Sequence, residues 1–189
     1  MGSETDLADV LRSLSKEPID AVVDNAGISL KDPVETIGFD AFRNAMEINV
    51  RAPLQIVQAL VPGMKARRFD RVVNVTSRAQ LGLRDFRVYA ATKAALSSMG
   101  KSWALELGGF GVTVNAIAPG PIETELFWGA MPKDSDEAQT YLKTIPVQRI
   151  GQPQEIAATV IHLLQKDAGF ITGQTIFACG GLTVGRAAN

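Results

Sequence analysis

Short apolar segments alternate with longer amphipathic segments along most of the chain. The short segments are rich in valine and isoleucine, and they predict buried strands over residues 19–23, 71–75, 112–117 and 175–178. Between them, apolar residues recur at helical spacing, which predicts helices over residues 5–14, 39–68, 88–107 and 154–164. Strands that alternate with helices predict an α/β fold whose parallel sheet is covered by helices on both faces.

The pattern is less regular between residues 121 and 150, where we expect mostly loop with two short helices. Phe127, Trp128 and Met131 place three large apolar side chains in this segment. These side chains form either one wall of a binding pocket or a patch that packs on the domain or on a neighbouring subunit. The spacing alone favours neither interpretation.

Ligands of parallel α/β sheets bind outside the carboxyl ends of the strands. This rule selects the segments that directly follow the predicted strands: residues 25–27, 76–77 and 119–120, and the region of Gly180. We therefore expect the binding site where these segments meet.

The composition adds to this picture by excluding several classes of partner and site. With 46% hydrophobic and 21% charged residues the chain is globular, and nineteen basic residues nearly balance twenty acidic ones. The densest basic cluster, residues 66–71, is predicted to be a helix end with solvated charges, so we expect no nucleic-acid partner. One cysteine, Cys179, excludes an internal disulfide, and one histidine, His162, excludes a multi-histidine metal site, so we expect no metal. The polar N-terminus and the lack of a long apolar run predict a cytoplasmic protein that does not enter a membrane.

Tyr89 and Lys93 are four residues apart near the start of the predicted helix 88–107, so they share one helix face. A free tyrosine has a pKa of about 10 and is a poor base at neutral pH. A nearby ammonium group favours the phenolate, which would suit Tyr89 for proton transfer. The alternative is an ordinary surface pair, and the spacing alone is weak evidence.

Two further polar residues stand at informative positions. Ser77 directly follows the strand 71–75, where its hydroxyl could donate to a substrate oxygen, although a serine there also commonly begins a turn. Asn49 lies within an apolar helical stretch, and a buried amide without a partner is costly. We therefore expect the Asn49 side chain to bond to the backbone or to an ordered water.

Five motifs together resemble those of the short-chain dehydrogenase/reductase family. They are Asn25-Ala26-Gly27, Asn49, Ser77, Tyr89-x-x-x-Lys93 and Pro119-Gly120, in the order and spacing of that family. The flanking stretches from Val114 to Thr124 and from Ile171 to Gln174 agree. The resemblance extends from about residue 18 to the end, and it is most similar to tetrameric 3-oxoacyl reductases and glucose dehydrogenases. It implies a single Rossmann-like, doubly wound domain over residues 1–189, with residues 121–150 as a substrate lid, that assembles into a dimer or tetramer.

The resemblance also implies a role for each matching residue in a reaction that uses NAD or NADP and a small carbonyl or alcohol substrate. Tyr89 would be the general acid/base, Lys93 would lower its pKa and hold the nicotinamide ribose, and Ser77 would position the substrate oxygen. Asn49 would anchor a water that relays protons. The remaining cofactor-binding residues would be Asn25, Ala26 and Gly27 on the adenosine side, and Pro119, Gly120, Ile122 and Thr124 around the nicotinamide.

The sequence departs from the family in two respects. Asp24 stands where the family usually has an asparagine, and an ionised carboxylate cannot donate a hydrogen bond, so we expect weaker bracing between strands there. In addition, the family's first strands and its Gly-rich phosphate-binding turn have no counterpart before Asp20, which predicts an N-terminally truncated fold with weakened cofactor binding. The strand 19–23 then becomes a sheet edge, which we expect to be covered by another chain or prone to aggregation.

Two functions remain open at this point. The first is an oxidoreductase of this family. The second is a cofactor-deficient relative that keeps the catalytic helix but acts as a binding or assembly partner without turnover.

Overall fold

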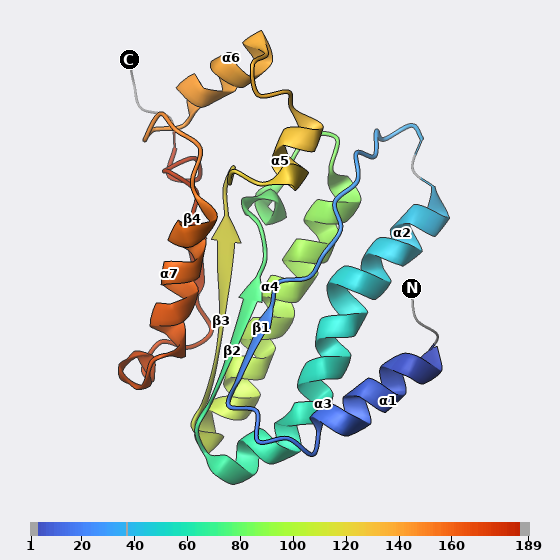
Figure 1. The fold of residues 1–189 in the computed structure, drawn as a ribbon, viewed down its shortest axis with the longest axis vertical. Helices are drawn as coiled ribbons and strands as arrows, with labels where there is room; N and C mark the ends of the chain where they lie inside the picture. The colour runs from blue at the N-terminus through green and yellow to red at the C-terminus, as the bar shows by residue number, and fades with distance from the viewer. Residues whose placement is uncertain (1–3, 37, 186–189) are drawn as a thin grey trace.

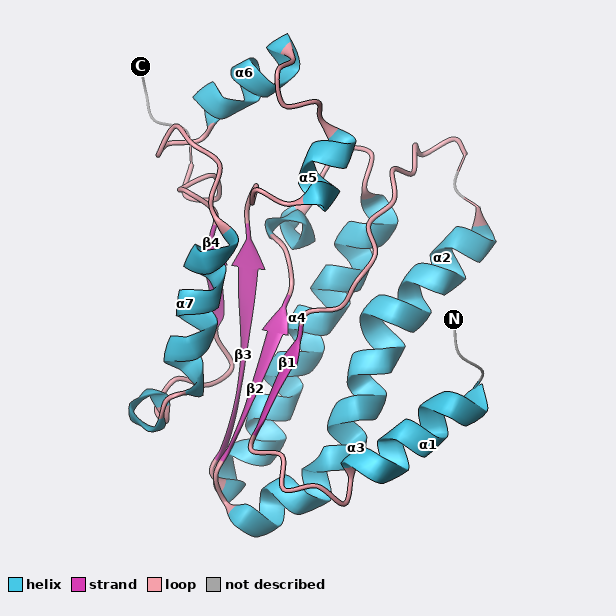
Figure 2. Ribbon diagram, viewed as in Figure 1, coloured by secondary structure: helices cyan, strands magenta, loops and turns pink. Residues whose placement is uncertain are grey.

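The sheet at the centre of the molecule is parallel throughout and follows the chain order β1-β2-β3-β4. The computed structural model describes residues 4–36 and 38–185. The strands in these residues, magenta in Figure 2, are β1 (Ala21–Asp24), β2 (Asp70–Val75), β3 (Val112–Pro119) and β4 (Thr175–Ala178). Each of them lies at one of the four predicted strands, so this part of the sequence interpretation is confirmed.

The predicted helices are also present, with small changes at their ends. The longer ones are α1 (Glu4–Leu14), α2 (Phe39–Met46), α3 (Ala52–Arg67), α4 (Arg87–Leu107) and α7 (Pro153–Leu164). The two short helices expected between residues 121 and 150 are α5 (Glu125–Ala130) and α6 (Asp136–Thr144). Single turns of 3₁₀-helix lie at η2 (Arg78–Leu81), η3 (Gly108–Phe110) and η4 (Lys166–Ala168).

Helices cover both faces of the sheet, as the predicted doubly wound fold requires (Figure 1). On one face Val72 and Val114 pack with residues of α3 and α4, in a core that includes Val57, Leu60, Met64, Ala104 and Leu107. On the other face Val73 and Ile117 pack against Leu163 of α7. Because successive strand residues point to opposite faces, this pattern fixes which side each neighbouring polar residue faces.

The helix predicted over residues 39–68 is continuous but changes its winding at η1 (Glu47–Arg51), a turn of π-helix between α2 and α3. There the N–H of Ala52 bonds to the carbonyl of Glu47, five residues earlier. Pro53 follows directly and has no N–H to give to the carbonyl of Asn49, so a regular α-helical bond is lost at this position. The widened turn holds Asn49, which is 0% exposed, on the side that faces α4.

The basic cluster at residues 66–71 differs from the prediction of solvated charges. Arg67 lies close to Asp70 (2.8 Å) and Asp20 (3.3 Å), and Arg71 is buried at the amino end of β2. The guanidinium of Arg71 stacks on Phe69 at 4.3 Å and donates to the carbonyl of Asp70. Burial at the end of a strand requires such partners, which a charge count cannot show. His162, in contrast, is exposed on α7.

The strand β1 lies at one edge of the sheet, with β2 on its inner side, as predicted. Val23 on this strand is exposed. Covering of this edge by another chain stays a prediction. Among the described residues, no helix is long and apolar enough to cross a membrane, and no cluster of three or more metal-ligating side chains is present.

Candidate active site

A cleft of about 600 Å³ opens at the carboxyl ends of β1, β2 and β3. The segment that carries α5 and α6 lies beyond the carboxyl end of β3 (Figure 1). This is the edge of the sheet that the sequence selects for ligand binding. Of the predicted site residues, those that line the cleft are Asn25, Gly27, Ser77, Tyr89, Lys93, Pro119, Gly120, Ile122 and Thr124. Two do not line it: Ala26 is exposed beside it, and Asn49 is buried behind it.

Tyr89 and Ser77 form the polar centre of this cleft. Tyr89 lies in the first turn of α4, and its hydroxyl is hydrogen-bonded with that of Ser77 at the end of β2. The Ser77 oxygen accepts from the N–H of Ala79 at 3.1 Å, so its own proton is free to be donated. Burial raises the pKa of Tyr89 above its usual 10.0, and the hydrogen bond from Ser77 opposes this rise only in part.

The start of α4, and with it Tyr89, is held by a residue that the sequence analysis missed. The carboxylate of Asp32 accepts a hydrogen bond from the N–H of Val88 at 2.9 Å. A negative charge at a helix N-terminus satisfies a free N–H group and interacts favourably with the helix dipole. Only the fold brings Asp32 to this position, because the two residues are separated by 56 positions in the chain.

Lys93 is 3% exposed, and its ammonium group donates to the carbonyl of Val75 at 2.8 Å. Its Nζ lies 5.8 Å from the centre of the Tyr89 ring. Burial lowers the pKa of Lys93 from 10.5 to about 8, while the negative charge of Asp24 opposes this change. The ammonium points to β2, and burial is the largest influence on the phenol. That Lys93 lowers the pKa of Tyr89 stays a prediction.

Asn49 connects three separate segments behind the cleft. Its amide donates to the carbonyl of Ile28 (2.9 Å) and to the hydroxyl of Thr92 (3.0 Å), and its oxygen accepts from the N–H of Ile28 (2.8 Å). Thr92 in turn donates to the carbonyl of Tyr89. The expectation that Asn49 bonds to the backbone is confirmed, and the bonds tie the loop after β1 to the helix that carries Tyr89 and Lys93.

Asp24 ends β1 and is 6% exposed, and one of its carboxylate oxygens, Oδ2, has no hydrogen-bond partner among the described residues. Burial raises its pKa from 3.8 to about 6, and the nearby positive charge of Lys93 lowers it. The sequence analysis expected this residue to weaken strand bracing. The structure adds that its charge acts on Lys93.

The outer wall of the cleft comes from η2, α5 and α6. Arg78 donates to the hydroxyl of Tyr141 at 2.7 Å, which joins the segment after β2 to α6. Phe127 packs near Tyr141, with ring centres 6.2 Å apart, and both line the cleft together with Met131. Trp128 packs edge-on against Phe127 instead. Phe127 and Met131 therefore belong to the pocket wall, whereas Trp128 supports it.

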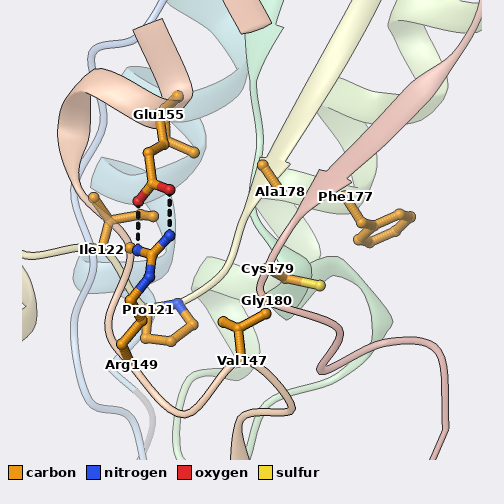
Figure 3. A pocket seen from close by; sticks show the side chains of 11 residues that line it. Pro121, Ile122, Val147, Arg149, Glu155, Phe177, Ala178, Cys179 and Gly180 are labelled. Carbon is orange, nitrogen blue, oxygen red and sulfur yellow. Dashed lines mark hydrogen bonds and ion pairs between the residues drawn. The ribbon is translucent and has the colours of Figure 1, made fainter. Parts of the chain in front are cut away.

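A smaller cavity of about 270 Å³ lies beside this cleft, between the end of β4 and the start of α7 (Figure 3). Gly180 lines this cavity and not the cleft, so the four predicted segments do not all meet in one place. Its two charged residues, Arg149 and Glu155, bind each other through two bonds of 2.7 and 2.6 Å. Paired in this way, they leave the cavity walls mostly apolar.

The cleft has the size of a small-molecule or cofactor site, and two glycines let the backbone approach closely around it. A Cβ atom on Gly27 would lie 3.3 Å from Nζ of Lys93 and 3.2 Å from Oδ1 of Asn49, so a glycine keeps the backbone close to this buried ammonium. A Cβ on Gly120 would lie 2.7 Å from the Cα of Cys179, so β3 and β4 meet there only because residue 120 is glycine.

Comparison with known proteins places the chain among dehydrogenases and reductases. A family model described as enoyl-(acyl carrier protein) reductase matches residues 2–183. The chain is 34% identical to the (2S)-[(R)-hydroxy(phenyl)methyl]succinyl-CoA dehydrogenase subunit BbsD of Thauera aromatica, over 86% of this chain and 64% of the relative. It is 35% identical to the 3-oxoacyl-[acyl-carrier-protein] reductase FabG of Thermotoga maritima, over 88% of this chain and 67% of the relative. The chain thus spans about two thirds of the length of these curated relatives.

Solved structures share the whole described fold. A putative NAD(P)-dependent gluconate 5-dehydrogenase from Beutenbergia cavernae, solved with bound NADP, superposes with a TM-score of 0.91 at 28% identity. The match covers 97% of this chain and 74% of that chain. The Rossmann-like sheet expected from the resemblance is therefore confirmed.

Proposed function

Because the chain belongs to the short-chain dehydrogenase/reductase family, we propose that it is an oxidoreductase that interconverts a carbonyl and an alcohol in a small molecule with NAD or NADP. One observation carries the proposal: the hydroxyls of Ser77 and Tyr89 and the ammonium of Lys93 line one cleft at the carboxyl ends of the strands. The names of the relatives support the reaction type, and the NADP in the structure from Beutenbergia cavernae supports the kind of cofactor.

When bound, the nicotinamide supplies or accepts the hydride. The residues that we propose to hold it are Pro119, Gly120, Ile122 and Thr124, with Asn25, Ala26 and Gly27 toward the adenosine side. Lys93 would hold the ribose, because its ammonium lies on the cleft floor beside Gly27. The affinities of the chain for NADH and for NADPH, measured side by side, would decide which of the two cofactors it prefers.

Tyr89 and Ser77 would handle the substrate oxygen. Ser77 already accepts a bond from Ala79, so its hydroxyl can donate to that oxygen and orient it. Tyr89 then gives its proton to the same oxygen during reduction, or takes it during oxidation. The raised pKa of Tyr89 keeps the phenol protonated before substrate binds, which is the form that reduction requires.

We propose that residues 121–150 form the substrate lid of a single catalytic domain. The support is that Phe127, Met131 and Tyr141 from this segment line the outer part of the cleft. We also propose a dimer or tetramer, because Leu54 of α3 and Leu105 of α4 are exposed on the surface that faces away from the sheet. The cytoplasmic location stays a prediction from the sequence.

The test combines cofactor binding and turnover. The purified chain is titrated with NADH and with NADPH by nucleotide fluorescence, and then assayed with ketones, β-keto thioesters and secondary alcohols. Saturable binding and turnover that Tyr89→Phe abolishes would support the proposal. Tyr141→Phe is the matched control, because Tyr141 is the other tyrosine of the chain and also lines the cleft. Folded protein with neither binding nor turnover would instead favour the non-catalytic binding or assembly partner.

A further inference from the structure

Asp24 and Lys93 meet on the same face of the sheet. Asp24 lies opposite Asn74 in the parallel register of β1 and β2, and opposite residues point to the same face. The amide nitrogen of Asn74 lies 2.9 Å from where a Cβ of Gly100 would stand, so this face is the one covered by α4. Asp24 therefore points toward the helix that carries Lys93.

The ammonium of Lys93, which extends from α4, reaches β2 one residue beyond Asn74. It bonds to the carbonyl of Val75, the residue after Asn74, and it also lies beside Gly27, three residues after Asp24. The carboxylate thus lies at the end of β1, and the ammonium of Lys93 is bonded to the end of the neighbouring strand β2. Their interaction is electrostatic, because no hydrogen bond or ion pair within the described residues joins them.

No hydrogen bond within the described residues satisfies the inner oxygen of Asp24. Both polar atoms of the neighbouring Asn74 side chain also lack partners, and Asn74 is 0% exposed. A buried carboxylate without donors is costly, so the positive charge beside it becomes its main source of stabilisation.

Neutral polar residues lie near the pair in the described part of the chain. Thr92 of α4, Asn49 of η1 and Asn74 of β2 are buried and carry no charge. Tyr89, one turn before Lys93 on α4, is the further titratable group, and its bond is with Ser77. Among the described residues Asp24 and Lys93 each perturb the pKa of the other, and no third charged group does so to either.

We propose that Asp24 is a positioning residue for Lys93: its buried carboxylate is the counter-ion that keeps the ammonium charged and in place on the floor of the cleft. An asparagine has the same size but no charge, so the residue type matters for its electrostatics and not for its volume. The pair is doubly charged between about pH 6, where Asp24 ionises, and about pH 8, where Lys93 loses its proton.

The consequence for turnover rests on the function proposed above, whereas the charge pair itself does not. If Lys93 holds the cofactor ribose, protonation of Asp24 below about pH 6 removes the counter-ion. Above about pH 8 the ammonium itself is lost. Cofactor affinity should therefore be highest between these limits.

The direct test measures the titration of Lys93 by NMR in the full chain without cofactor, with lysine labelled at Nζ. Asp24→Asn should lower the midpoint of Lys93 from about 8 by about one pH unit, because it removes the charge that favours the ammonium. Asp70→Asn is the matched control, since Asp70 is also a buried carboxyl and lies at the opposite end of the sheet. An unchanged midpoint in Asp24→Asn, or an equal fall in Asp70→Asn, would overturn the proposal.

A reciprocal measurement keeps the proposal testable if Asp24→Asn fails to fold. The carboxyl carbon of Asp24 is titrated in the wild-type chain and in Lys93→Met, where its midpoint should rise above about 6 because an opposing charge is gone. A midpoint that stays in place contradicts the proposal. If turnover is found, the alkaline limb of its pH profile should shift to lower pH in Asp24→Asn. The variant should therefore lose activity at a lower pH than the wild type does as the pH is raised. If no turnover is found, the two NMR results still stand or fall by themselves.

Discussion

The two ends of the parallel sheet treat buried charge in opposite ways. At the amino end, Asp70 is bonded to Arg67, which also reaches Asp20 and the carbonyl of Ile19. At the carboxyl end, no ion pair within the described residues includes Asp24, and it interacts with Lys93 only through space. One oxygen of each carboxylate, Oδ2, has no hydrogen-bond partner there. Both carboxylates are buried, yet only the first is part of a bonded network.

This difference separates residues that stabilise the fold from residues that are placed to act on a ligand. The ion pair at the amino end joins the last residue of α3 to the first residue of β2, away from the cleft. The carboxyl end leaves one oxygen of Asp24 without a hydrogen-bond partner among the described residues, and it places Tyr89 and Lys93 on the wall of an open cleft. Incompletely satisfied polar groups cost stability, and folds retain them mostly where a ligand is bound or transformed. The comparison predicts that changes at the carboxyl end affect chemistry and changes at the amino end affect stability.

The largest expected effect is at Tyr89. Tyr89→Phe removes the proton donor and should lower kcat by about a thousandfold, while the urea midpoint moves little. Steady-state kinetics with the best substrate from the panel would measure the loss. A variant that keeps at least a tenth of the wild-type kcat would show that the carboxyl end is not specialised for proton transfer.

The second effect concerns the pH dependence of stability at Asp24. The unfolded chain loses this proton near pH 3.8 and the folded chain near pH 6, so between these values the folded state holds more protons. Raising the pH through this interval should therefore destabilise the fold, by on the order of 3 kcal/mol for this group. Urea unfolding between pH 4 and pH 7 should show this contribution in the wild type and not in Asp24→Asn. Identical slopes in the two proteins would contradict the assigned burial of the charge.

A third prediction addresses the amino end. Arg67→Met leaves the buried Asp70 carboxylate without its bonded partner and should cost about 2 kcal/mol of unfolding free energy. Catalytic constants should remain within about twofold, because Arg67 lies at the far end of β2 from the cleft. Lys101→Met, a change at an exposed residue of α4, controls for the loss of a positive charge. If kcat fell tenfold in Arg67→Met, the proposed separation of the two ends would be wrong.

The smallest expected effect lies at the outer wall. Tyr141→Phe removes the hydroxyl that accepts from Arg78 and should raise KM about fivefold with little change in kcat, since one hydrogen bond is worth about 1 kcal/mol. Initial rates over a range of substrate concentrations separate the two constants. A selective fall in kcat would instead place Tyr141 in the chemistry.

The sequence predicts the sheet and the helices because these depend on short-range patterns, and the ordered motifs of the family resemblance single out Ser77 and Tyr89. Ser77 and Tyr89 lie in one cleft since the carboxyl ends of neighbouring parallel strands meet at one edge. What it misses depends on partners far apart in the chain. The bonds of Asn49 reach across 21 and 43 positions, and the carboxylate of Asp32 reaches Val88 across 56. Charge counts failed for Arg67 and Arg71, because burial and pairing are properties of the folded chain.

The π-helical turn at Glu47–Arg51 sets a rotational phase between α2 and α3. One residue corresponds to about 100° around a helix axis. Deleting a single residue within this turn would let a regular α-helix form while rotating α2 about a quarter turn relative to α3. The Asn49 amide would then leave the backbone of Ile28, and the loop after β1 would lose its anchor to α4. A more regular helix would therefore leave one wall of the cleft without its support. The number of residues in this turn matters to the site as much as the residue types around it do.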